Sequence, residues 1–147
     1  MKKIGVNLIF IFLTVTILSF VVCIVHTNDA LAINGDGLTP GFWKQSQHFD
    51  RCVQYSPDDS FEDVFVVQSK STSGMTLLDA LKKGGGGINA LNRHAVAALL
   101  NYTNSYVNYL FSEASVISLV QQAYNSGDYE VIKMTLAYQN EMGSTLD

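Results

Sequence analysis

The sequence predicts an all-α domain, a compact bundle of about five to six helices around a central apolar helix. The strongest observation is the stretch Ile88–Tyr102, in which residues 95–100 are all apolar and alanine and leucine predominate, as in a helix rather than a strand. Because this stretch is apolar on nearly every side, we expect the other helices to surround it. Helix start and stop signals also recur along the chain, whereas a strand-like alternation is convincing nowhere and ambiguous at 64–67.

Two hydroxyl–proline pairs predict where the first two helices begin. In Thr39-Pro40 and Ser56-Pro57, a capping side chain precedes a proline whose missing N–H is not needed at the first helical position. The apolar residues of the first helix are Phe42, Trp43, Phe49, Cys52 and Val53, and those of the second are Phe61, Val64 and Phe65.

Three more helices follow from capping residues and helical spacing. They are predicted over 76–83, 112–127 and 128–143, each opening on Thr, Ser or Asp and ending at or just before a glycine.

The four glycines 84–87 precede the central helix. A phosphate-binding loop would need Lys and then Ser or Thr after them, so we interpret the run as a hinge between two helices.

The N-terminus predicts export. A basic start, an apolar run Ile4–Val25 and the small residues of Ala30-Leu31-Ala32 are typical of a secretory signal peptide over 1–32, which leaves a single helical domain over 33–147. Two alternatives stay open. The apolar run is 22 residues long, enough to span a bilayer as an uncleaved anchor, and a pilin-like cut after Gly5 would retain it as a filament helix.

Charge and cysteine content limit the classes of partner that the chain can bind. Without the leader the chain has seven basic and twelve acidic residues, a net charge of −5, which argues against nucleic acid and against anionic membrane surfaces. A membrane contact is therefore expected only through the N-terminal segment, if it is not cleaved. Cys52 is the one cysteine outside the leader, so no disulfide framework is expected. The thiol is buried, reactive, or bridges two copies in a disulfide-linked dimer.

Residues 39–52 concentrate the groups that could carry chemistry. Trp43 is the only tryptophan, and His48 and Cys52 are four apart, so on a helix they share a face that His94 could approach. Such groups could hold zinc, or form a Cys-His nucleophile and base. The alternative is structural, with the Trp43 indole buried and bonded, and His94 beside the core face. Trp43, His48, Cys52 and His94 are the candidate binding residues; no catalytic residue, metal ligand or cofactor is assigned.

Two features of the segment 101–109 suggest surface roles. Tyr102, Tyr106 and Tyr109 have helical spacing and either form an exposed row that binds glycan or protein, or pack against the core edge. Asn101-Tyr102-Thr103 is a glycosylation sequon, which matters only if Asn101 is exposed.

The motifs "GLTPGFWKQSQHF", "LLDAL", "LNRHAVAALLN" and "VISLVQQAY" resemble an uncharacterised family of small prokaryotic secreted or cell-surface modules. The resemblance implies export, often within larger surface proteins, and carries over no catalytic residue. Its motif positions in this chain are Thr39, Pro40, Gly41, Phe42, Trp43, Lys44, Arg93, His94 and Asn101.

The function that we expect is that of an exported, non-enzymatic helical module, secreted or at the cell surface, with a structural or binding role. Its partner would be an extracellular protein or glycan. The competing hypothesis is an extracellular metal-binding or Cys-His enzyme that uses His48, Cys52 and His94. Geometry separates the two, because the enzyme requires these three side chains to converge on an open cleft.

Overall fold

The computed structural model describes residues 36–52 and 54–143, so the predicted signal peptide lies outside the described residues. Within those ranges the fold is all-α, as predicted, with no strand and a single isolated bridge between Ser60 and Thr76. The elements are α2 (Pro40–Trp43), the 3-10 helix η1 (Ser46–Arg51), α3 (Phe61–Phe65), α4 (Leu77–Lys82), α5 (Ile88–Thr103), α6 (Glu113–Ser126) and α7 (Tyr129–Asn140).

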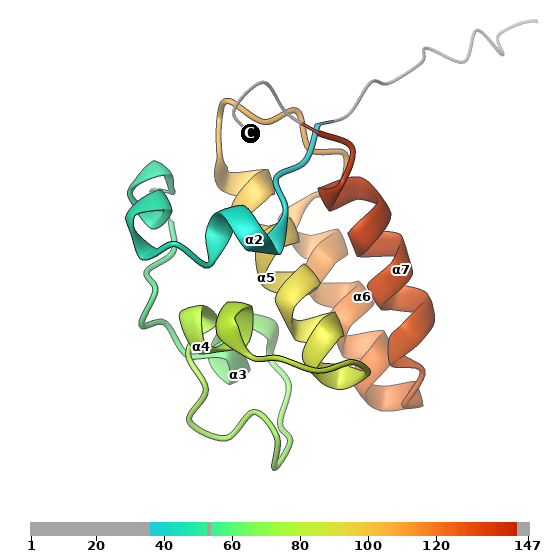
Figure 1. Ribbon diagram of the computed structural model, residues 1–147. Coiled ribbons are helices and arrows are strands. Elements are labelled where there is room, and N and C mark those ends of the chain that lie inside the picture. The colour runs from blue at the N-terminus through green and yellow to red at the C-terminus, as the bar shows by residue number, and fades with distance from the viewer. Residues whose placement is uncertain (1–35, 53, 144–147) are drawn as a thin grey trace, which may run out of the picture. The chain divides into compact units, whose positions relative to one another are not determined.

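Helix α5 is the centre of the bundle. It packs against α2, α4, α6 and α7, and these helices lie around it in Figure 1. Every residue from Ala95 to Leu100 is fully buried. The prediction of an enclosed central helix is therefore confirmed, and its apolar surface on all sides is the reason that the other helices gather around it.

The last two helices begin where the sequence predicts, and α6 also ends there, whereas α7 ends at Asn140, three residues before Gly143. The Ser112 side chain accepts a hydrogen bond from the backbone of Ser115, and the Asp128 side chain accepts one from Val131. Gly127 ends α6 in the left-handed conformation, with φ 77°, which glycine adopts without a steric penalty.

The first helix begins as predicted but is shorter. Thr39 caps it and Pro40 opens it, yet α2 ends at Trp43 and the chain continues as η1. Six residues separate Trp43 from Phe49, which is about 240° on a continuous α-helix, so the two rings would point in different directions. The extended backbone at Gln45 (ψ 108°) breaks the helix and lets both rings enter the core.

The prediction that the second helix begins at Pro57 is wrong. Helix α3 starts four residues later and is capped by Ser60, whose side chain accepts from the backbone of Asp63. The Pro57 and Asp59 carbonyls instead accept hydrogen bonds from the backbone N–H groups that begin α4, at 3.1 and 2.9 Å. The hydroxyl–proline pair thus forms a turn that docks α4.

The ambiguous segment 64–67 is helical at Val64 and Phe65 and then turns at Val66. Val66 ends α3 in the left-handed region (φ 53°, ψ 48°), an uncommon conformation for a β-branched residue, and its side chain is exposed.

Residues 36–43, which we call the N-terminal strap, cross the ends of α5 and α7. The Asp36 N–H donates to the Asn108 carbonyl at 3.0 Å, and the Gln139 side chain donates to the Asp36 carbonyl at 3.3 Å. At Gly37 the two backbones approach so closely that a Cβ atom there would lie 2.1 Å from the Gln139 carbonyl oxygen. Only glycine fits this crossing.

We predict that Gly37→Ala destabilises the domain by about 2–4 kcal/mol, because the added methyl group meets backbone that cannot move aside. Gly84→Ala is the matched control, since a Cβ at Gly84 meets nothing within 4 Å. Chemical denaturation of both variants measures the difference. Equal stability of the two variants would show that the strap does not pack in this way.

Candidate functional site

The motif residues of the strap and α5 meet in a buried polar network, formed by Trp43, His94, Asn101, Tyr109 and Asn140. Trp43 is fully buried, as the structural interpretation expects, and its Nε1 donates to the Asn101 Oδ1 at 2.9 Å. The same oxygen accepts from the Leu38 N–H at 3.1 Å. Asn101 therefore holds the strap by both a side chain and the backbone.

The other half of the network joins α5 to α7. The Asn101 Nδ2 donates to the Leu38 carbonyl at 2.9 Å and to the Asn140 Oδ1 at 3.0 Å. The Tyr109 hydroxyl donates to the same Asn140 oxygen at 2.8 Å, and the Asn140 Nδ2 donates to the His94 carbonyl at 2.9 Å. Asn101 thus uses its full capacity of two acceptor and two donor positions. The network ties three separate parts of the chain together.

His94 lies at the edge of this network and is half-buried. Its Nδ1 is 3.5 Å from the Asn140 Nδ2, so the ring accepts there and carries its proton on Nε2 when neutral. Burial lowers the pKa of His94 below 6.5, although the nearby Glu141 carboxylate opposes the shift. His94 is therefore neutral at pH 7.

His48 lies outside this network and stacks on the ring of Phe42. Its imidazole lies parallel to Phe42 with ring centroids 3.9 Å apart, and its Nδ1 donates to the Phe42 carbonyl at 2.8 Å. The Arg51 guanidinium sits 5.6 Å from the centre of the same ring. This arrangement closes η1 back onto α2.

Cys52 is a packed thiol. Its side chain is buried, and its Sγ donates to the Leu100 carbonyl at 3.7 Å. Burial raises the pKa of the thiol, and a hydrogen bond with Thr103 only partly opposes this. Cys52 is thus protonated and a weak nucleophile at neutral pH, and a disulfide to a second copy would require it to leave the core.

The three groups of the enzyme hypothesis each have their own partner. His48 bonds to Phe42, Cys52 to Leu100, and His94 to Asn140. Among residues 36–52 and 54–143, no three His, Cys, Asp or Glu side chains are grouped so that they could hold a metal ion. These residues give the metal or Cys-His hypothesis no support.

Arg93 explains the glycine run that precedes α5. Its guanidinium donates to the carbonyls of Lys83 and Gly85, the latter at 2.8 Å, and the Asn89 side chain donates to the Gly84 carbonyl at 3.1 Å. Side chains of α5 therefore bind the loop through its carbonyl groups. The motif arginine serves to close the turn between α4 and α5.

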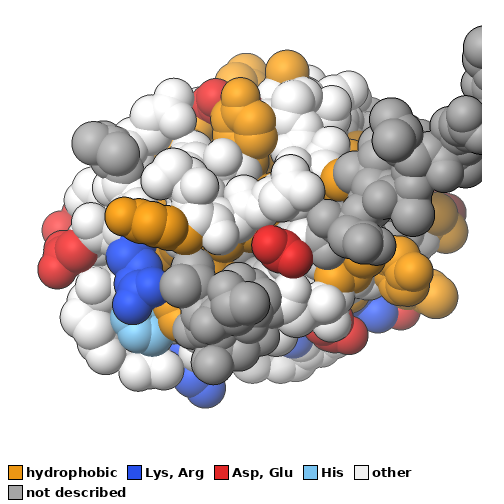
Figure 2. All heavy atoms as spheres, turned by 90° about the horizontal axis from the view of Figure 1, so that it is seen from above, with side chains coloured by type: hydrophobic (Ala, Val, Ile, Leu, Met, Phe, Trp, Pro, Cys, Tyr) orange, Lys and Arg blue, Asp and Glu red, His pale blue; other side chains and the backbone are white. Residues whose placement is uncertain are grey.

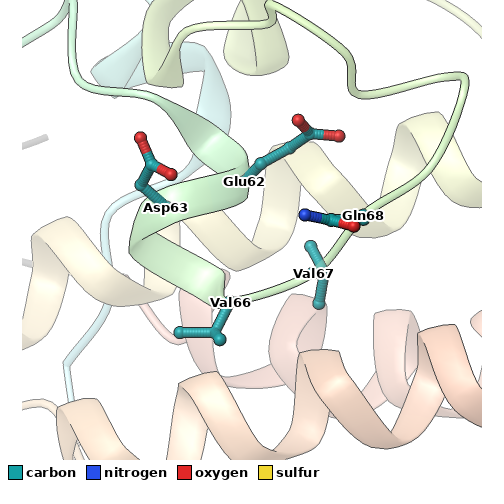
Figure 3. Close-up of a pocket in the computed structure, with 5 residues that line it drawn as sticks. All are labelled: Glu62, Asp63, Val66, Val67 and Gln68. Atoms are coloured by element: carbon teal, nitrogen blue, oxygen red, sulfur yellow. The ribbon is translucent and has the colours of Figure 1, made fainter.

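A shallow depression of about 510 Å³ lies beside α3, lined by Glu62, Asp63, Val66, Val67 and Gln68. Figure 3 shows Glu62 and Gln68 reaching toward the same space, while Asp63 extends from another side of α3. The Glu62 carboxylate already accepts from the Thr72 hydroxyl at 2.8 Å and from the Ser69 N–H at 3.3 Å. It organises the 68–74 loop, and none of the sequence-predicted site residues lines this depression.

The predicted tyrosine row is divided by the structure. Tyr106 is 74% exposed and Tyr102 is also exposed, whereas Tyr109 is partly buried and bonded to Asn140. Asn101, the sequon asparagine, is fully buried with both side-chain atoms bonded. A glycan cannot be attached to Asn101 in the folded domain.

Exposed large hydrophobic side chains gather in one part of the described chain. Apart from Val66, all of them lie between residues 102 and 142, and they fall into two groups by their place in the fold. We call the first the α7 face; it consists of Val131, Met134 and Tyr138. We call the second the tyrosine end; it consists of Tyr102, Tyr106, Leu110 and Met142. The sequence places Val131, Met134, Thr135 and Tyr138 along one side of this helix, a spacing that is typical of a core stripe. In the structure that side is exposed, and α7 instead packs on the core through Ile132 and Leu136.

In comparisons with protein families, curated proteins and solved structures, nothing matches this chain. The resemblance drawn from the motifs therefore stays an expectation. The described residues themselves define a small all-α bundle held by a buried polar network, with two exposed apolar surfaces.

We predict that Asn101→Ala destabilises the domain by about 3–5 kcal/mol, because the Trp43 indole N–H and both backbone groups of Leu38 lose their buried partners. Asn125→Ala, at an exposed position of α6, is the control and should change stability by less than about 0.5 kcal/mol. Urea unfolding monitored by Trp43 fluorescence measures both. A loss below about 1 kcal/mol for Asn101→Ala would contradict the role given to the network.

We also predict that stability falls as the pH drops below about 6.5, because the unfolded chain then binds a proton at His94 more readily than the folded one. The loss continues until the pH reaches the lowered pKa of the folded state. The free energy of unfolding is measured at several pH values between 7.5 and 5. Its decrease with falling pH should be smaller in the His94→Gln variant than in the unmodified chain. An unchanged slope would show that His94 does not titrate differently on folding.

Proposed function

We propose that the chain is an exported, non-enzymatic helical module that binds a protein partner at or outside the cell surface through the α7 face. The observation that carries the proposal is the exposure of Val131, Met134 and Tyr138, which are 57%, 60% and 75% exposed. Their spacing of three and four residues aligns them along the side of α7 opposite the core. A contiguous apolar row of this kind is typical of an interface.

The neighbouring helix α6 shows what a solvated face of this bundle is like. Its exposed positions are all polar except Ala114: Ser115, Ser118, Gln122, Asn125 and Ser126. Helices α6 and α7 pack against each other and both bury one side against α5. The apolar character of the α7 face is therefore a property of that helix, since an equally placed helix of the same domain is polar outside.

The composition of the α7 face suits a protein more than a glycan. Methionine and tyrosine are enriched in the cores of protein interfaces, where a flexible and an aromatic side chain fill pockets. Glycan binding depends on aromatic platforms with adjacent hydrogen-bonding groups, and here only Tyr138 is aromatic. Beside the row, Glu130 and Lys133 form an ion pair at 2.6 Å, which provides the polar rim of such an interface.

The buried network supports a non-enzymatic role. Among the candidate site residues, Trp43 and His94 are hydrogen-bonded inside the fold, and Cys52 is a buried, protonated thiol. These contacts account for the stability of the fold. Export rests on the N-terminal sequence pattern.

Photocrosslinking in cells that produce the protein tests the α7 face. A photoreactive benzoylphenylalanine replacing Met134 should give one discrete, larger adduct, and the same group replacing Gln122 on α6 should give none. Adding Tyr138→Ser to the first variant should reduce its adduct at least fivefold, because the one aromatic anchor of the row is lost. Mass spectrometry distinguishes a protein adduct from a glycan adduct.

Equal labelling from positions 134 and 122, or no discrete adduct from either, would refute the proposed binding surface. A thermal melt of each variant is the folding control. All three substituted side chains are exposed, so the melting temperatures should stay within a few degrees of the unmodified chain.

A further inference from the structure

The charged residues of the domain are unevenly distributed along the chain. Outside the predicted leader there are seven basic residues, and six of them lie between residues 44 and 93. Between residues 95 and 143 the only basic residue is Lys133, whereas four residues are acidic: Glu113, Asp128, Glu130 and Glu141. Three of these acids belong to α7 or to the positions that cap it. The charged residues beside the α7 face are therefore mainly acidic.

The one basic side chain of α7 is neutralised within its own helix. The Lys133 Nζ lies 2.6 Å from the Glu130 Oε1, and the Lys133 side chain is only 22% exposed. This is the one ion pair of the part of the chain that the structure describes, so neither Asp128 nor Glu141 is paired with a base there. His94, on which the Glu141 carboxylate acts, is neutral at pH 7 and does not balance it. Two exposed carboxylates are left without a counter-charge.

These two carboxylates lie at opposite ends of the α7 face. Asp128 caps the start of α7 and Glu141 caps its end, and 13 residues correspond to about 20 Å along a helix axis. Because each residue turns an α-helix by about 100°, the two positions fall on either side of the stripe formed by Val131, Met134 and Tyr138. Figure 2 looks onto the end of the bundle at which α7 finishes in Figure 1, and acidic and apolar side chains reach the surface there. A partner that covers the stripe comes close to both carboxylates.

We propose that the partner of the α7 face is a basic amphipathic helix of another protein. Its apolar side chains contact Val131, Met134 and Tyr138, and its Lys or Arg side chains meet Asp128 and Glu141. Apolar anchors spaced by three and four residues are what a helix presents to a helical surface. Basic groups are required because a carboxylate that loses water at an interface is stabilised only by an opposite charge or a hydrogen-bond donor. The inference rests on the proposed function, since it names the partner's chemistry for the same surface.

The same charges disfavour a second copy of this chain as the partner. Two α7 faces packed against each other would bring two acidic rims together, and like charges at an interface oppose association. The net charge of −5 on each copy without its leader adds to this repulsion. A basic partner is attracted to the surface by both terms.

Three designed peptides test the chemistry. The full chain is purified in the form in which producing cells export it, and binding is followed by fluorescence anisotropy of labelled helical peptides. The first peptide has a leucine stripe with lysine on its other positions, the second has the same stripe with glutamate, and the third has lysine with serine in place of leucine. We expect the first to bind at least tenfold more tightly than the other two, and its affinity to fall as salt is added.

Variants of the chain locate the contact. The double variant Asp128→Asn, Glu141→Gln should weaken binding of the lysine–leucine peptide at least fivefold, and asparagine keeps the cap of α7 because it is as good a capping residue as aspartate. Asp50→Asn, Asp58→Asn is the matched control, since it removes the same charge from exposed positions outside α7 and should change the affinity less than twofold. Tyr138→Ser should weaken binding at least fivefold. Thermal melts of all variants verify folding.

Four results would overturn the proposal: no binding of the lysine–leucine peptide, equal binding of the lysine–leucine and glutamate–leucine peptides, equal effects of the two double variants, or no effect of Tyr138→Ser. A crosslinked adduct of twice the chain's mass from position 134 would also overturn it, because the partner would then be a second copy. A discrete protein adduct from position 134 without a preference for the lysine peptide would refute the basic partner and leave the α7 face as the binding surface. The two proposals can therefore fail separately.

Discussion

The hydrogen bonds of Asn101 are the interaction on which the rest of this domain depends. One amide on α5 satisfies the Trp43 indole and both backbone groups of Leu38, and it reaches Asn140 on α7. Without it, the strap would bring three polar groups into a core that offers no other partner for them, each at a cost of about 1–3 kcal/mol. The strap, α5 and α7 are therefore stable only in this one arrangement. The close approach of Gly37 to the Gln139 carbonyl follows from it.

That arrangement determines which surfaces are left over. Because residues 95–100 make the middle of α5 apolar all around, α2, α4, α6 and α7 each cover one side of it, and none of them is available to cover another helix completely. The outer face of each helix is therefore exposed to solvent. That of α6 is polar, whereas that of α7 is apolar. The loop between α5 and α6 has to return past the strap, and Asn140 and Asn104 hold it there with Tyr106 turned outward. The two exposed apolar surfaces are thus consequences of how the core is closed.

Much of the fold could be predicted because its signals are local. The apolar run 95–100 identified the central helix, and the capping residues Ser112 and Asp128 identified α6 and α7. Ser56-Pro57 misled the prediction because the same local pattern serves a turn when its carbonyls bind a distant segment, here the start of α4. The buried polar network was harder to predict than the helices. Asn101 drew attention as part of a motif and of a sequon, but its partners are 63, 58 and 39 residues away in sequence, and no local pattern encodes such contacts.

The stretch from Thr39 to Cys52 shows how residues suited to catalysis can serve packing. A tryptophan, a histidine and a thiol within fourteen positions are compatible with an active site by composition, but catalysis requires at least one of them to face a reactant. Trp43 and Cys52 face the core, and the Nδ1 of His48 is bonded to the Phe42 carbonyl. Where such groups are used for packing, a small domain binds other molecules through the side chains that its core leaves exposed. In this chain the apolar side chains left exposed are those of α7 and of the segment around the end of α5, and the proposed partner surface is among them.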